Sequence, residues 1–188
     1  MIRGRSIRLA AVGVALLSAG PLAAQGKPWM DQRWHEYVFE EDGFAVLSPV
    51  PPKREVVGRL TDAGAVEIHS YTMSLDWDHV LVVSCTDFGD KMSYKTPERV
   101  IEDVRRGSLL SSGPDARVVN QHRFTVQGSP AVEVEYVSGS FRFVSRIMYI
   151  KGVLIQLIAK SPAEESFEQE RRDFFHSFRL LGRFQPSP

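Results

Sequence analysis

The sequence predicts an α+β domain in which helices pack on the faces of an antiparallel β-sheet. Three observations support this fold class. Short apolar segments separated by tight turns fill residues 35–87 and 117–159, which is typical of antiparallel strands. Two other segments, beginning at residues 96 and 161, space their apolar residues as helices do. The run "HVLVVSCTDF", residues 79–88, is apolar on both faces, so it is expected inside the sheet.

The first 24 residues have the pattern of a secretory signal peptide. Arg3, Arg5 and Arg8 precede the apolar run "LAAVGVALLSAGPLA", and small residues follow it. The run is too short and too interrupted by glycine and proline to span a membrane comfortably, and no later run is long enough. We expect cleavage after Ala23 or Ala24 and a periplasmic or secreted protein without a transmembrane anchor.

Removal of this signal from the 188-residue chain leaves 164 residues, enough for one domain with a substantial core. We expect a lead-in segment at 25–34, one domain at 35–182 and a tail at 183–188. The whole chain has 23 basic and 23 acidic residues, so loss of three arginines leaves 20 against 23, a net charge of −3. This balance argues against nucleic-acid binding, which usually needs a concentrated basic patch.

The N-terminal half is expected to contain a hairpin and three further strands. Tyr37 and Phe39 lead into the tight turn at Asp42–Gly43, and an apolar strand leads out of it until prolines end it. The segments 54–60 and 65–75 follow as a pair around a turn at 61–64. The apolar strand at 79–88 comes next.

Two helices are expected. In the first, Thr96 is the predicted N-cap and Pro97 the first helical residue, with Val100, Ile101 and Val104 on one side. The second is predicted to open with a capping box formed by Ser161 and Glu164, with Pro162 at its first position.

The second helix places Phe167, Phe174 and Phe178 within a narrow arc, with Phe175 at its edge. A membrane-surface helix would carry a basic polar face, whereas the polar residues here include acids. We therefore expect the phenylalanines to close a core against the sheet.

Strands are predicted at 117–126, 130–137, 141–150 and 153–159. Alternation puts Glu133 and Glu135 on one face, and the turn at 138–139 brings Arg142 and Arg146 onto the same face as cross-strand partners. Such a face is either a charged binding strip or a solvated surface with weak ion pairs. The second interpretation is favoured.

The order of elements resembles that of the PsbP-like group, which includes the extrinsic photosystem II protein PsbP and many small exported bacterial proteins. The similar segments are "EDGFAVLSPVPP", "GVLIQLIAKSP" and "FFHSFRLL", within roughly residues 35 to 182. The resemblance implies an antiparallel sheet between helices, an α/β/α sandwich, and accessory or binding roles rather than catalysis. The group has no shared catalytic motif from which a residue could be transferred.

The sequence contains no recognisable catalytic, cofactor-binding or metal-binding motif. Five histidines are present, and none has the spacing of a zinc site: His35, His69, His79, His122 and His176. The single cysteine, Cys85, has apolar neighbours and is expected to be a buried core residue rather than a nucleophile. We therefore predict no catalytic residue, no metal ligand and no cofactor.

The densest polar cluster is Asp76, Trp77, Asp78 and His79, called the Asp76–His79 corner below. Two carboxylates and an imidazole could hold a metal ion or act as acid and base. The favoured interpretation is a turn between strands, because aspartate side chains bond to local backbone amides. Alternation along an extended turn predicts that Asp76 and Asp78 share a side while His79 points away. Asp87 and Asp90 form a second polar loop of the same kind.

These observations predict a non-enzymatic exported accessory protein that binds a partner, with another envelope or exported protein as the expected partner. Two alternatives stay open. One is a small metal-dependent enzyme or metal-binding protein that uses the Asp76–His79 corner. The other is a carrier of a small apolar ligand, held in a cavity lined by residues such as Phe141, Phe143 and Tyr149. The sequence does not predict the oligomeric state.

Overall fold

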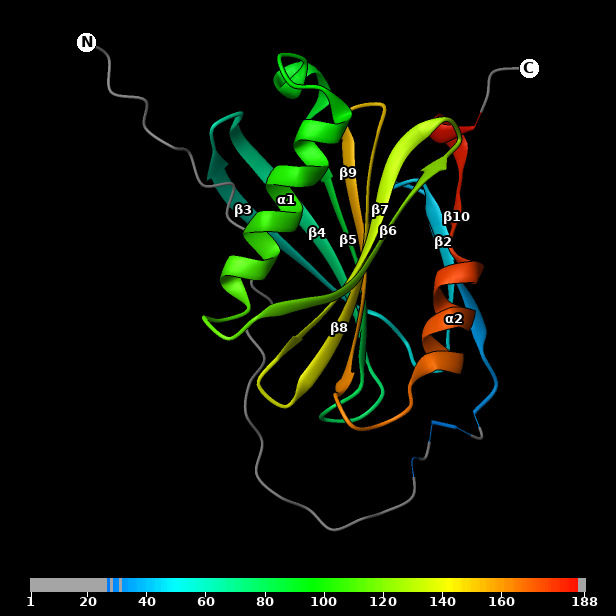
Figure 1. Ribbon diagram of the computed structural model, residues 1–188. Helices are drawn as coiled ribbons and strands as arrows, with labels where there is room; N and C mark the ends of the chain where they lie inside the picture. The colour runs from blue at the N-terminus through cyan, green and yellow to red at the C-terminus, as the bar shows by residue number, and fades with distance from the viewer. Residues whose placement is uncertain (1–26, 28, 31, 186–188) are drawn as a thin grey trace.

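The computed structural model describes residues 27, 29–30 and 32–185, so the predicted signal peptide lies outside the described residues. Its main element is a seven-stranded antiparallel sheet in the order β3-β4-β5-β9-β8-β7-β6 (Figure 1). The strands are β3 Lys53–Thr61, β4 Gly64–Ser74, β5 Val80–Asp87, β6 Arg117–Val126, β7 Ser129–Ser138, β8 Phe141–Ile150 and β9 Val153–Pro162. As predicted, the apolar strand β5 lies inside the sheet, between β4 and β9.

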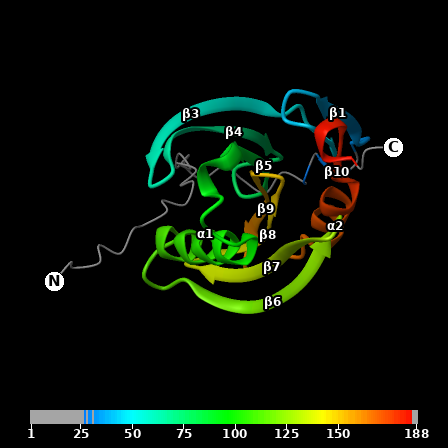
Figure 2. The same cartoon turned by 90° about the horizontal axis from the view of Figure 1, so that it is seen from above.

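One face of this sheet is concave and holds the helix α1, Pro97–Ser111 (Figure 2). The side chain of Thr96 accepts a hydrogen bond from the backbone of Arg99, so the predicted N-cap is confirmed. Val100, Ile101 and Val104 are buried against a cluster of apolar side chains from β7, β8 and their neighbours.

The opposite, convex face carries a second sheet and the second helix (Figure 2). The second sheet has the order β1-β2-β10, formed by β1 His35–Phe39, β2 Phe44–Ser48 and β10 Arg179–Leu180. The helix α2, Glu168–Ser177, packs against β2. Phe167, Phe174 and Phe175 are buried in the core between the two sheets, as predicted. Phe178 follows the end of the helix and packs against this core half-buried, so its predicted place on the helix is wrong. The α+β fold with helices on both faces of an antiparallel sheet is therefore confirmed.

The predicted start of the second helix is wrong. Ser161 and Pro162 continue β9, where they pair with Arg142 and Phe141 of β8. The ladder already satisfies the backbone at Ser161. Its hydroxyl donates to the carbonyl of Pro162, whereas the hydroxyl of an N-cap serine accepts a hydrogen bond from a helical N–H. The helix begins only at Glu168, after a short turn, so the capping-box pattern here belongs to the end of a strand.

The core extends into both segments expected to flank the domain. Trp29, from the lead-in segment, is 1% exposed and belongs to the same core as Phe174. Phe184 is also 1% exposed and lies in the short 3-10 helix η2, Gly182–Phe184. Its ring lies against Gly43, where a Cβ would come within 2.8 Å of it, so the glycine is needed for space as well as for its positive φ of 72°. No described helix is long and apolar enough to cross a membrane.

Candidate functional site

The Asp76–His79 corner is a tight turn between β4 and β5 organised by the Asp76 carboxylate. Asp76 Oδ1 accepts hydrogen bonds from the backbone N–H of Asp78, at 2.8 Å, and of His79, at 2.7 Å. The N–H of Leu75 donates to the carbonyl of His79 at 2.9 Å. These bonds are the local backbone bonding that favours aspartate in turns.

The same carboxylate also binds two buried side chains. The indole N–H of Trp29 donates to Asp76 Oδ2 at 3.0 Å, and Nδ1 of His79 lies 3.0 Å from the same oxygen. The expectation that His79 points away from Asp76 is therefore wrong. The turn is not extended: it folds back, and burial of the imidazole against the rings of Trp29 and Phe167 brings Nδ1 to the carboxylate.

The charge state of Asp76 follows from these contacts. Burial alone would raise the pKa of its carboxyl, but hydrogen bonds from Trp29, His79 and Asp78 outweigh burial and hold the pKa below its ordinary value. Asp78 differs, because burial raises its pKa, the neighbouring Asp76 raises it further, and its Oδ1 has no hydrogen-bond partner among the described residues. Both oxygens of Asp76 therefore accept hydrogen bonds, whereas Oδ1 of Asp78 accepts none from the described residues.

The corner has the chemistry of a support rather than of a reaction centre. His79 is 2% exposed, and its Nε2 has no hydrogen-bond partner in the described part of the chain; Glu165 Oε2 lies 3.5 Å from it. The rings of Trp29 and Phe167 pack against the buried imidazole. Across the described residues, no group of three histidine, cysteine or acidic side chains is arranged to hold a metal ion.

The predicted charged face of β7 and β8 is present. Arg146 lies 2.8 Å from Glu133, Arg142 pairs with Glu135, and Arg171 of α2 approaches Glu133 at 3.5 Å. Arg146 also donates to the backbone carbonyl of Phe175, so α2 covers part of this face. The face is therefore half-buried and laced with ion pairs, and it connects the helix to the sheet.

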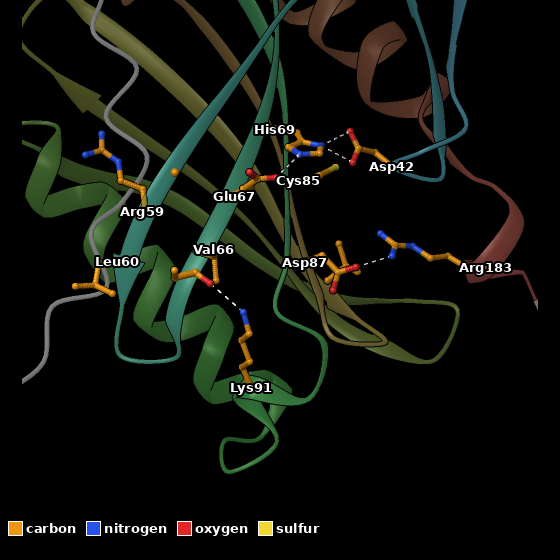
Figure 3. Close-up of a pocket in the computed structure, with 13 residues that line it drawn as sticks. Asp42, Arg59, Leu60, Val66, Glu67, His69, Cys85, Asp87, Lys91 and Arg183 are labelled. Atoms are coloured by element: carbon orange, nitrogen blue, oxygen red, sulfur yellow. Dashed lines mark hydrogen bonds and ion pairs between the residues drawn. The ribbon is translucent and has the colours of Figure 1, made fainter.

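An open cavity of about 570 Å³ lies beside β3 and β4, on the convex side of the sheet; we call it the groove (Figure 3). Figure 3 shows Asp42 and Arg183 on one side of it and Arg59 and Leu60 on the other. Its lining comes from the β1–β2 turn and from β3, β4, β5, η1, β9 and η2: Asp42, Gly58, Arg59, Leu60, Ala65, Val66, Glu67, His69, Cys85, Asp87, Lys91, Val153 and Arg183. It combines an apolar floor with a charged rim.

A buried hydrogen-bond cluster around Asp42 fixes one wall of the groove. Nδ1 of His69 lies 2.8 Å from Asp42 Oδ1, and the hydroxyl of Tyr71 donates to Asp42 Oδ2. Asp42 is in the β1–β2 turn, whereas His69 and Tyr71 are in β4, so the cluster ties the small sheet to the large one. Burial raises the pKa of the Tyr71 hydroxyl, and its hydrogen bond to Asp42 raises it further.

Cys85 lies opposite His69 in the β4–β5 register, so a cysteine, a histidine and an aspartate meet at the groove. The arrangement does not activate the thiol. Cys85 is 3% exposed, burial raises its pKa, and the Asp42 carboxylate raises it further, so the thiolate is disfavoured. The prediction that Cys85 is a buried core residue is confirmed.

The rim of the groove holds both signs of charge. Arg183 pairs with Asp87 at 2.6 Å, and Lys91 of the 3-10 helix η1, Gly89–Met92, donates to the carbonyl of Ala65 at 2.9 Å. Glu67 is largely exposed, and Arg59 forms no ion pair with any described residue. Glu67 also lies 3.9 Å from Nε2 of His69. Arg59 is opposite Val66 in the β3–β4 register, which directs its side chain toward the face that holds α1.

The remaining predicted residues lie apart from the groove. His35 and His176 are exposed on β1 and α2, and His122 of β6 stacks on Phe124. Asp90 is in the first turn of η1. Phe141, Phe143 and Tyr149 share the concave face with α1: Phe143 stacks on Tyr136, and the ammonium of Lys160 lies 3.9 Å from the ring of Phe141.

Sequence reasoning identified the corner and missed the groove. The Asp76–His79 contact spans three residues, whereas Asp42 and His69 are 27 residues apart. The local signal for the groove was weak: Gly58 interrupts an otherwise regular strand pattern, which indicates a place where something approaches the backbone closely.

No protein-family model matches the chain, and no curated protein matches its sequence. Among solved structures, it is similar to the solution structure of cyanobacterial PsbP, CyanoP, from Synechocystis sp. PCC 6803, with a TM-score of 0.55. The two sequences are 16% identical, and the match covers 86% of this chain and 100% of the other. The chain is an α+β protein with the PsbP-like fold. The resemblance drawn from its sequence is confirmed at the level of fold.

Proposed function

We propose that this protein is an exported, non-enzymatic accessory protein that binds another envelope or exported protein through the groove. The observation that carries the proposal is the groove itself, an open cavity of about 570 Å³ with an apolar floor and a charged rim. Surfaces that bind proteins combine an apolar centre with a polar rim in this way. The exposed Glu67 and the Arg183–Asp87 pair at the rim supply charges for orienting a partner.

Binding fits the polar groups of the groove better than catalysis does. Asp42 is already bonded to His69 and Tyr71, and the Cys85 thiol is buried with a raised pKa. These groups hold the wall and the floor in place. A rigid, pre-formed surface lowers the entropic cost of binding a partner.

Two further points support the accessory role and the location. The PsbP-like resemblance implies accessory or binding roles, and the first 24 residues have the charge and apolar pattern of a secretory signal. Export would bring the folded domain to the compartment of its partner.

A photocrosslinking amino acid at Glu67, on the groove rim, tests the proposal in the producing cell. The matched control places the same amino acid at Leu110 on α1, because the two positions are similarly exposed, at 75% and 71%. We expect one protein, distinct from this chain, to be captured from position 67 and not from position 110.

The substitution Gly58→Phe provides the second arm of the test. A Cβ at Gly58 meets no atom within 4 Å, and Gly58 lines the groove. We therefore expect the fold to accept a phenylalanine there and its ring to occupy the groove. We expect the substitution to abolish capture from position 67 without unfolding the protein. Identical captured proteins at positions 67 and 110, or capture unaffected by Gly58→Phe, would contradict the proposed function.

A further inference from the structure

The strand β3 forms one free edge of the seven-stranded sheet and pairs only with β4 among the described strands. Eight of its nine residues are exposed, including Val56, Val57 and Leu60. An open edge with apolar side chains is a template for pairing with another strand.

The hydrogen-bond pattern shows which residues offer backbone groups at this edge. The N–H of Leu75 bonds to the carbonyl of His79, so odd-numbered residues of β4 bond toward β5 and even-numbered ones toward β3. The pairing of Val57 with Ile68 then directs the odd-numbered residues of β3 toward β4. The N–H and C=O groups of Arg54, Val56 and the other even-numbered residues point outward.

We propose that β3 pairs antiparallel with β3 of a second copy of this chain, around a two-fold axis at Val57. In this register Val56 lies opposite Gly58 of the second copy, and both are residues whose backbone groups point outward. Val57 faces its own counterpart. Glu55 lies opposite Arg59 of the second copy and Arg59 opposite its Glu55, which gives two cross-strand ion pairs on one face.

The charges of β3 select this register over its neighbours. A shift of the two-fold axis to Val56 would put Lys53 opposite Arg59, a repulsive pair. A shift to Gly58 would put Arg59 opposite Val57 and leave Glu55 without a basic residue across the junction. Charges commonly protect edge strands from pairing, but those of β3 are complementary to themselves.

The other free edge, β6, lacks these properties. A bulge between Val118 and Asn120 interrupts its register, and bulges twist an edge away from regular pairing. The strand carries Arg117 and Arg123 and no acidic residue, so pairing with its own copy would bring no opposite charges together. Dimerisation is therefore expected at β3 and not at β6.

Charge reversal followed by mixing tests the dimer, with the purified full chain as the cell produces it. Glu55→Arg places arginine opposite Arg59, and Arg59→Glu places glutamate opposite Glu55, each twice. We expect either variant alone to raise the dissociation constant of the dimer at least about tenfold, measured by analytical ultracentrifugation. An equimolar mixture restores both ion pairs and is expected to recover the mass of two chains.

The control Arg123→Glu reverses a charge on β6 and is expected to keep the wild-type association. Both tested residues are exposed, so melting followed by circular dichroism is expected to show folded proteins. A wild-type chain that stays monomeric at about 100 μM, a concentration at which a dimer of micromolar dissociation constant would form, would overturn the proposal. So would variants that associate like wild type, or a mixture no heavier than its components.

Discussion

The molecule contains two aspartate–histidine pairs with opposite surroundings. Asp76 and His79 are three residues apart, and the pair is enclosed by Trp29 and Phe167. Asp42 and His69 are 27 residues apart, and that pair forms the wall of an open groove. Both carboxylates hold backbone or side-chain donors in place, but only the second pair lies where a partner can reach it.

Residue types alone do not distinguish an enclosed structural corner from an open groove. The Asp76–His79 corner has the residues of an acid–base or metal site, but Asp76 and His79 face inward and stabilise a turn. The groove uses similar residues together with exposed charges and free volume. Access to a ligand separates the two more clearly than residue type does.

The largest expected effect is on the corner. Trp29→Ala removes a ring that is 1% exposed together with its hydrogen bond to Asp76, and it should lower the free energy of unfolding by about 3 to 5 kcal/mol. Trp77→Ala is the matched control, because that ring is 68% exposed, and should change stability by about 0.5 kcal/mol or less. Equal free energies of unfolding for Trp29→Ala and Trp77→Ala, measured by urea unfolding, would show that the corner does not support the core.

The second-largest effect on stability is expected at the groove wall. Asp42→Asn puts amide hydrogens where the carboxylate accepts bonds from His69 and Tyr71, so a buried donor loses its acceptor. We expect a loss of about 1 to 3 kcal/mol in the free energy of unfolding. Asp62→Asn, at the exposed β3–β4 turn, is the control. If the two variants melted at the same temperature, the wall would not depend on Asp42.

A pH series sharpens the contrast between the corner carboxylates. The pKa of Asp76 is lowered in the folded protein, so its stabilisation is present above the ordinary value of 3.8 and is lost as the pH falls through the lowered pKa. Asp76→Asn should therefore cost about 1 kcal/mol at neutral pH, and the difference from wild type should vanish in acid. A cost independent of pH would contradict the assigned role.

The smallest effect has the opposite sign. The pKa of Asp78 is raised, so its charge destabilises the folded protein at neutral pH. Asp78→Asn should raise the free energy of unfolding by about 0.5 to 1 kcal/mol, and the gain should disappear as the pH falls through the raised pKa. If Asp78→Asn were less stable than wild type at neutral pH, the Asp78 carboxylate would have a stabilising interaction in the folded protein, contrary to this expectation.

Elements with local signals could be predicted from the sequence. The helix capped by Thr96, the antiparallel strands and the buried β5 each depend on spacing within one segment, and all are observed. The helix start at Ser161 failed because pairing with Arg142 of β8, 19 positions earlier in the chain, decides the conformation there.

The site was predictable only in part, because contacts between segments distant in sequence leave no local pattern. The turn-forming role of Asp76 follows from residues two and three positions away, so local rules identified it. The groove requires the β1–β2 turn, η2 and β4 to meet, and sequence spacing carries no information on that. The hairpin of β1 and β2 was predicted and is observed. Its third strand, β10, was missed, since Arg179 and Leu180 pair with β2 across more than half of the chain.

The central claim is that the groove binds a partner while the corner only supports the fold. Capture of the partner from a crosslinker at position 67, measured per folded molecule, tests it in two backgrounds. We expect Asp76→Asn to retain capture despite its lower stability, and Gly58→Phe to lose capture at unchanged stability. Loss of capture in Asp76→Asn with full capture in Gly58→Phe would contradict the account.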